Sequence, residues 1–345
     1  MNRKQRRTAA KVASKAGKAG KSASSTAEAV VQKAIAAAQV GALAEAERAL
    51  DEVLARYPDH VEALHHKGML LARGEHLEEG IALLRRVVAI KPKESLYWNN
   101  LAAAELTADR PEQALAAAQA AVRLEPKYVM AWQNLATCLG DLDRPQEQIE
   151  ALKRVVALAP HDAENWSQLG IAELDRKDLA AAEIAFREAL KRAPQNSDHL
   201  SNLGVLLVQR NQPAEALPHL EASLAMNPDR FTAALHFGLA LAITGDRPKA
   251  LRWLRRATSI KPRADEAWGA LADIAMASGE KVEAIDAARR AAMIAPDNSV
   301  HRHRLERFQG QPQGQPQVLA APVAPQSPVG ETTDSLSRMD QIYIR

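Results

Sequence analysis

Six hydrogen-bonding side chains recur along the sequence at a constant interval of 34 residues. They are His66, Asn100, Asn134, Gln168, Asn202 and His236. An amide both donates and accepts hydrogen bonds, as the backbone of an extended peptide does, so a row of amides can hold a peptide with little regard to its side chains. If these residues lie in a row on one surface, their chemistry is that of peptide recognition.

Acidic side chains accompany this series, four positions before its members. Glu164 precedes Gln168 and Asp198 precedes Asn202, while Glu28, Glu62 and Glu266 take the same place elsewhere in the series. Residues four apart lie on the same face of a helix. These carboxylates therefore bias the surface toward neutral or basic ligands.

Residue patterns for catalysis are missing from the sequence. It contains no G-x-x-x-x-G-K-S/T loop, G-x-G-x-x-G turn, G-x-S-x-G elbow or H-E-x-x-H helix. The single cysteine, Cys138, excludes an intramolecular disulfide and a thiolate-cluster metal site, and its neighbours predict a buried, inert thiol. The adjacent His65 and His66 would project about 100° apart on a helix, which suits a shared metal poorly. We therefore expect no enzyme activity, no cofactor and no metal.

Evenly spaced prolines indicate the elements that position these side chains. Eight of them follow the same interval without an insertion or deletion: Pro58, Pro92, Pro126, Pro160, Pro194, Pro228, Pro262 and Pro296. A proline disrupts a helix because it lacks an N–H and clashes with the preceding turn. Each proline therefore marks the end of a unit, and the eight units extend over residues 27–298.

Each unit reads as two short helices. In the unit 163–196, helical spacing relates Trp166, Leu169 and Gly170, and then Ala182 and Phe186. The tryptophans at the place of Trp166 are expected to pack against the partner helix of their own pair. The break between the two helices is expected at residues that tolerate left-handed dihedral angles, namely Gly41, Asp109, Asp143, Asn211, Gly245 and Gly279, and near Lys177-Asp178.

The pattern W-x2-L-G…A-x3-F…P, repeated at this 34-residue period, resembles the tetratricopeptide repeat, or TPR. Its eight copies cover 272 of the 345 residues. The resemblance implies an all-α fold, a right-handed α-solenoid superhelix of eight helix pairs whose first helices line a concave groove. The row of amides is also similar to the asparagines in the TPR arrays of O-linked N-acetylglucosamine transferases. Asparagine is common at this place throughout the family, so part of the row can equally be family background.

The chain is expected to have four parts. Residues 1–26 form a basic arm that is disordered or nascent-helical, residues 27–298 the eight-repeat solenoid, residues 299–308 a capping helix, and residues 309–345 a Pro/Gln-rich disordered tail with a short apolar C-terminal segment. Residues 1–25 carry eight Lys or Arg and no acid. If the arm is helical, one basic stripe contains Lys4, Arg7, Lys11, Lys15 and Lys18. Such a stripe would favour weak contact with nucleic acid or an anionic membrane.

Together these observations favour a non-enzymatic scaffold or adaptor, expected in the cytoplasm, that binds an extended peptide or partner protein in the concave groove. Two alternatives stay open. One is an electrostatic anchoring module that uses the basic arm. The other is a partner or substrate-presenting subunit for a separate glycosyl- or sulfotransferase.

Overall fold

The structure is a computed structural model, and it describes residues 26–74 and 76–310. Every regular element in this part of the chain is an α-helix. A helix over residues 26–39 comes first. It is followed by α2 (Leu43–Arg56), α3 (Val61–Ala72), α4 (Leu77–Ile90), α5 (Ser95–Thr107), α6 (Pro111–Leu124), α7 (Val129–Asp141), α8 (Pro145–Leu158), α9 (Ala163–Asp175), α10 (Leu179–Arg192), α11 (Ser197–Gln209), α12 (Pro213–Met226), α13 (Phe231–Ile243), α14 (Arg247–Ile260), α15 (Asp265–Ala277), α16 (Lys281–Ile294) and α17 (Ser299–Gly310).

The helix ends follow from local sequence, as predicted. The second helix of a pair stops just before the periodic proline, so that α10 ends at Arg192 and Pro194 lies in the turn. Within the described residues, the break inside the pair contains a left-handed residue in seven units: Gly41, Asp109, Asp143, Lys177, Asn211, Gly245 and Gly279. The expected positions of the breaks are therefore confirmed.

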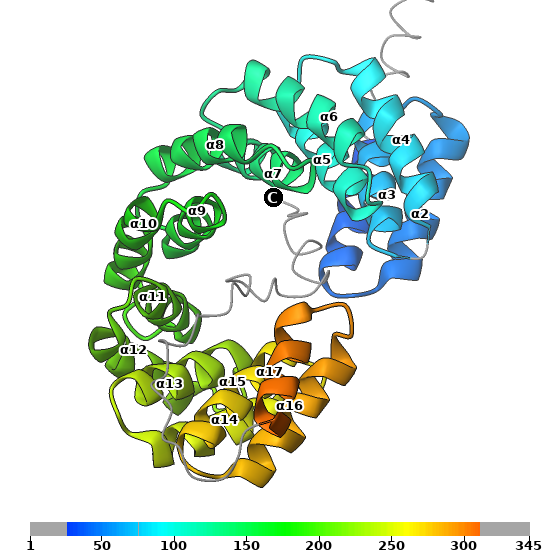
Figure 1. Ribbon diagram of the computed structural model, residues 1–345. Helices are drawn as coiled ribbons and strands as arrows, with labels where there is room; N and C mark the ends of the chain where they lie inside the picture. The colour runs from blue at the N-terminus through cyan, green and yellow to red at the C-terminus, as the bar shows by residue number, and fades with distance from the viewer. Residues whose placement is uncertain (1–25, 75, 311–345) are drawn as a thin grey trace, which may run out of the picture. The chain divides into compact units, whose positions relative to one another are not determined.

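The chain divides into two compact units, and the boundary falls inside α8, between Ala151 and Leu152. In unit 1, each helix from α2 to α6 packs on the next, and the first helices α3, α5 and α7 also contact one another in order. Unit 2 repeats this arrangement with the first helices α9, α11, α13 and α15, and Figure 1 shows α9 and α11 in one row and α10 and α12 in another. The first helices of each unit thus form a continuous layer, which we call its first-helix layer. The α-solenoid of helix pairs is confirmed.

Close helix packing explains the small residue at the place of Gly170 in the first helix of a pair. In the pair α9 and α10, a Cβ added to Gly170 would lie 2.5 Å from Cδ1 and Cε1 of Phe186, a fully buried ring. Protein interiors are packed too tightly for such an atom to be accommodated without movement. The glycine therefore allows the two helices of the pair to approach.

The periodic tryptophans are less buried than the sequence predicted. Trp166 is half-buried, and the Arg192 guanidinium of its partner helix lies 4.8 Å from the centre of its ring. Its indole N–H donates to the carbonyl of Pro160, in the preceding turn, at 3.0 Å. Three other tryptophans make the same bond at 2.9–3.0 Å: Trp98, Trp132 and Trp268. The ring therefore packs on its own pair as expected, and it also ties the turn between two repeats to the next first helix.

Helix α17 covers the end of unit 2, in agreement with the expected capping helix. It packs on α16, and its Phe308 ring is fully buried. His301 Nε2 lies 2.7 Å from Asp265 Oδ2. Arg304 donates from Nε and Nη2 to the two carboxylate oxygens of Asp273, at 2.9 and 3.1 Å. Paired charge-assisted bonds of this kind fix orientation, so α17 is held on α15 by polar contacts as well as by Phe308.

Candidate functional site

In unit 1, side-chain hydrogen bonds run through three consecutive first helices. Asn134 of α7 donates from Nδ2 to Asn99 Oδ1 of α5 at 2.9 Å. Asn99 donates to its neighbour Asn100 at 3.3 Å, and Asn100 Nδ2 lies 2.7 Å from His65 Nε2 of α3. All four side chains are buried. Because buried polar groups are costly unless they are hydrogen-bonded, this chain of bonds ties each first helix to the one before it.

The protonation of His65 follows from these contacts. An amide N–H group is a donor, so Nε2 of His65 accepts from Asn100 and the imidazole is neutral, with its proton on Nδ1. Burial, and secondarily the neighbouring His66, lower the pKa of His65 to about 3. The ring packs edge-on against Tyr97, whose pKa is raised by burial and then by Glu62 and Glu94.

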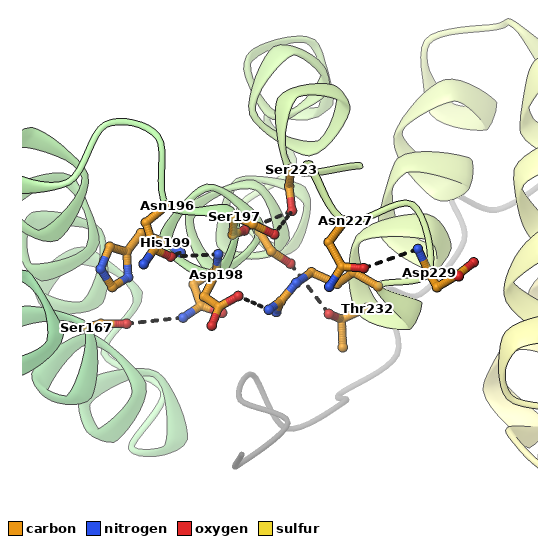
Figure 2. A network of polar contacts seen from close by, with 12 residues as sticks. Ser167, Asn196, Ser197, Asp198, His199, Ser223, Asn227, Asp229 and Thr232 are labelled. Atoms are coloured by element: carbon orange, nitrogen blue, oxygen red, sulfur yellow. Dashed lines mark hydrogen bonds and ion pairs between the residues drawn. The ribbon is translucent and has the colours of Figure 1, made fainter. Parts of the chain in front are cut away.

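Unit 2 contains a second polar network, shown in Figure 2. Asn202 of α11 donates from Nδ2 to Ser167 Oγ of α9 at 3.2 Å. Asn196 caps α11, because its Oδ1 accepts from the backbone N–H groups of Asp198 and His199 at 2.8 and 3.1 Å. The carboxylate of Asp198 forms an ion pair with Arg230. This network joins α9 to α11 and fixes the beginning of α11.

One spacing relates the bonds that cross between repeats. Asn100 to His65, Asn134 to Asn99 and Asn202 to Ser167 each join side chains that are 35 positions apart. The sixth residue of a repeat therefore donates to the fifth residue of the repeat before it. Sequence reasoning missed this pairing, although its signal was present in the polar fifth residues that precede the asparagines.

The predicted site residues differ in their surroundings. We expected the series to face an open groove, and the structure gives the side chains of Asn100, Asn134, Asn202 and His236 little exposure, at 2, 3, 7 and 0%. Neighbouring first helices of the same unit contact one another, such as α5 with α7 and α11 with α13, and this limits the exposure of side chains between them.

The remaining predicted site residues are more accessible. Gln168 is exposed, and it donates to the exposed Glu164 at 2.7 Å, one turn earlier on α9. His66 is half-buried. Asp198 keeps 49% of its side chain exposed, yet Arg230 neutralises it, so the expected bias toward basic ligands falls on the other exposed carboxylates of the series, Glu28, Glu62 and Glu164.

His236 has an unusual environment in α13. Its Nδ1 lies 2.9 Å from the backbone carbonyl of Thr232, one turn earlier, and therefore carries the ring proton. Nε2 is buried without a hydrogen-bond partner in the described residues. Burial lowers the pKa of His236 to about 4, with the bond to Thr232 opposing the shift. The ring is neutral at pH 7.

Two glutamates stand where the family pattern has a tyrosine in the middle of the first helix, and the structure explains them. Glu105 is buried and accepts from Nε and Nη2 of Arg85, at 3.0 and 2.7 Å, from the second helix of the preceding repeat. Glu173 makes the equivalent ion pair with Lys153 at 3.9 Å. The cation takes the same place before the acid in both pairs, a second cross-repeat spacing that sequence reasoning missed.

The described residues offer little for catalysis. Burial raises the pKa of Cys138 to about 12, with Asp141 adding to the effect, so the thiolate is strongly disfavoured, and the expectation of a buried thiol is confirmed. Within residues 26–74 and 76–310, no three His, Cys, Asp or Glu side chains converge as metal ligands would. No helix in the same part of the chain has the length and hydropathy to cross a bilayer. The basic arm, the expected tail and its apolar segment lie outside the described residues.

Comparison with known families decides the identity of the repeat. A tetratricopeptide repeat model matches residues 123–297, which is just over half of the chain, and a second tetratricopeptide repeat model matches residues 31–95. The chain belongs to the tetratricopeptide repeat family. No curated protein matches the sequence of this TPR protein.

Solved structures share the fold of this TPR protein at low sequence identity. The Cut9–Hcn1 hetero-tetramer of the APC/C contains a chain that is 14% identical, with a TM-score of 0.56 over 81% of this chain and 55% of that one. PilF of Pseudomonas aeruginosa is 19% identical, with a TM-score of 0.53 over 61% of this chain and 95% of that one. YrrB, described as a TPR protein with an unusual peptide-binding site, is 22% identical, with a TM-score of 0.46 over 55% of this chain and 97% of that one.

Proposed function

We propose that this TPR protein is a non-enzymatic scaffold that binds an extended peptide of a partner protein along its first-helix layers. Tetratricopeptide repeats are protein-interaction scaffolds in general, and this chain is a member of that family. Peptide binding is the finer claim. The observation that carries it is the arrangement of the periodic amides relative to the bonds they already make.

In the amides of Asn134 and Asn202, the NH2 group is hydrogen-bonded and the oxygen is not. Their Nδ2 atoms donate to the preceding repeat, whereas their Oδ1 atoms make no hydrogen bond within the described residues. Neither Oδ1 is among the buried atoms that lack a partner. An oxygen with surface access and a fixed direction can accept the backbone N–H of an extended peptide. Asn100 differs, because its Oδ1 already accepts from Asn99.

Accessible side chains next to the amides would complete the contact. Gln168 and Glu164 form an exposed pair on α9, and His66 lies half-buried on α3. The Gln168 amide retains an oxygen for a peptide N–H, while Glu164 favours a neutral or basic residue nearby. Asp198 and His236 complete the candidate set, with Asp198 engaged by Arg230 and His236 fully buried.

The test compares three single variants: Asn134→Ala, Asn202→Ala and Asn100→Ala. A partner is captured from a lysate, identified by mass spectrometry and mapped to a binding peptide, whose affinity is then measured for each variant. Loss of one accepting oxygen should weaken binding about five- to tenfold, since a net hydrogen bond contributes about 1 kcal/mol. Asn100→Ala breaks the same kind of inter-repeat bond without removing a free acceptor, so it serves as the matched control. Equal losses in all three variants would assign the effect to stability and refute the proposal.

A second function is favoured by the charge of the N-terminal arm. Residues 1–25 carry eight Lys or Arg and no acid. Binding that depends on the arm should collapse as the salt concentration rises, because counterions compete for the anionic partner, whereas hydrogen bonding to an amide should change little. Deleting residues 1–25 and repeating the capture at two salt concentrations separates the two. A captured glycosyl- or sulfotransferase would support the role of substrate-presenting subunit.

A further inference from the structure

Unit 1 contains an apolar cavity of about 110 Å³ near the C-terminal end of α3. It lies between the helix over residues 26–39, α2 and α3. Eight of its eleven lining residues are apolar, including Ile35, Leu43, Ala46, Leu50, Met69 and Leu70. Three of the eight are alanines, whose short side chains leave the volume unfilled. An apolar cavity of this size can accept a small apolar group.

The mouth of the cavity is apolar as well. Leu43 lines the cavity and is nevertheless 53% exposed. An exposed leucine at an apolar cavity is the kind of surface that proteins often cover. The cavity is therefore open to a side chain that arrives from solvent.

Polar groups stand on both sides of the apolar centre. His66, Met69, Leu70 and Arg73 are separated by three, four and seven positions on or at the end of α3, so they share one face. The exposed Arg73 has no ion pair within the described residues, and the His66 ring has no hydrogen bond there. His66 also belongs to the periodic series of polar side chains, so the cavity adjoins the first-helix layer of unit 1.

We propose that this cavity anchors an aliphatic or aromatic side chain of a peptide whose neighbouring carboxylate pairs with Arg73. The inference rests on the peptide binding proposed above and specifies the ligand at the unit 1 end. His66 and Arg73 lie about 10 Å apart along the helix, which is the length of about three residues of extended peptide. The acidic residue is therefore placed one or two positions from the apolar one.

Several observations select a peptide over other occupants. The interior is too apolar for a charged or polar small molecule, and a purely apolar ligand would leave the Arg73 charge unused. A side chain with an adjacent carboxylate satisfies both parts. A second copy of this chain is the main alternative occupant, and it is an outcome of the test.

The test selects a displayed library of random decapeptides against the full chain. The expected result is enrichment of an apolar residue one or two positions from Asp or Glu. The best peptide is then synthesised and its affinity measured by fluorescence anisotropy. Ala38→Leu, which fills the cavity from its wall, should weaken binding at least tenfold. Ala242→Leu, at the same place of a repeat in unit 2 and also half-buried, should leave the affinity unchanged.

A second variant tests the same proposal if Ala38→Leu does not fold. It reverses the charge of Arg73, whose exposed side chain can be replaced without disturbing the core. Arg73→Glu should weaken binding at least tenfold, and a peptide with Lys in place of its acid should recover most of that loss. The exposed Arg252→Glu, on α14, is the control. Circular dichroism and thermal melting of every variant establish that it folds.

Each other outcome overturns the inference in a distinguishable way. Peptides that bind but ignore Ala38→Leu and Arg73→Glu, while losing affinity in Asn134→Ala and Asn202→Ala, would refute the anchor and leave the proposed function standing. Enrichment of no peptide would refute both. A dimer in sedimentation that Ala38→Leu dissociates would show that a second copy occupies the cavity and would overturn the peptide anchor.

Discussion

The hydrogen-bonded asparagines of unit 1 should contribute measurably to the stability of the array. Asn99 is fully buried, accepts from Asn134 at 2.9 Å and donates to Asn100 at 3.3 Å. Asn99→Ala removes both bonds and leaves the Asn134 amide with only the Asn99 backbone carbonyl at 3.4 Å. At about 0.5–1.5 kcal/mol for each net bond, with a penalty for the stranded partners, the cost is about 2–3 kcal/mol.

The double variant Asn99→Ala/Asn134→Ala measures the interaction energy between these two side chains. Asn134→Ala alone strands Asn99 Oδ1 in a fully buried site and should cost about 1–3 kcal/mol. Once one partner of the bond is gone, removing the other costs less. The sum of the two single-variant losses in unfolding free energy should therefore exceed the loss in the double variant by about 1 kcal/mol, as expected for residues in direct contact.

The assay must resolve single repeats, because repeat arrays open locally and do not always unfold in one step. Native-state hydrogen exchange of the amides in α5 and α7 gives the local opening free energies. Gln168→Ala is the control, since this exposed amide bonds to an exposed glutamate and should change stability by less than about 0.5 kcal/mol. An interaction energy below about 0.3 kcal/mol between Asn99 and Asn134 would refute the reasoning.

Three further predictions concern other positions. Burial lowers the pKa of His236 from 6.5 to about 4. Between these pH values, the imidazole is protonated in the unfolded chain and neutral in the folded chain. This should destabilise unit 2 progressively as the pH falls through that window, by up to about 1.4 kcal/mol per pH unit, and His236→Asn should flatten the dependence of the urea midpoint on pH. Lys177 has a φ of 66°, so Lys177→Gly should raise stability by about 1 kcal/mol in urea unfolding, whereas Gly245→Ala, at a φ of 99°, should lower it. Gly170→Ala drives a methyl group to 2.5 Å from the buried Phe186 ring and should cost about 1–3 kcal/mol by thermal melting; an unchanged melting temperature would contradict the tight packing of α9 on α10.

The course of the backbone was predictable because its signals are local. One proline in every repeat ends the second helix, and a residue such as Asp109 or Asn211 adopts the left-handed turn within the pair. Both effects depend on the residue itself and on its immediate chain neighbours, so they can be read from sequence without knowledge of the packing.

The surroundings of the amides were harder to predict, because they depend on contacts between repeats. The position of Asn134 on one helix predicted a side chain that faces solvent, yet the adjacent first helix covers it. The pairing with Asn99, 35 positions earlier, becomes visible only when two repeats are compared. The same holds for Glu105 and Arg85, 20 positions apart, an acid and a base that belong to different repeats.

The constant spacing of the inter-repeat bonds bears on how such a chain can change its length. Deleting residues 95–128, one whole repeat, would bring the sixth residue of the following repeat, Asn134, opposite His65, where an asparagine already donates to the same ring nitrogen. The buried Asn134 amide would keep an acceptor. A deletion that is not a whole repeat would not preserve the spacing of 35 positions that relates these bonds. Duplication or loss of one whole repeat is thus compatible with the hydrogen bonds between repeats. These bonds favour changes of chain length in multiples of one repeat.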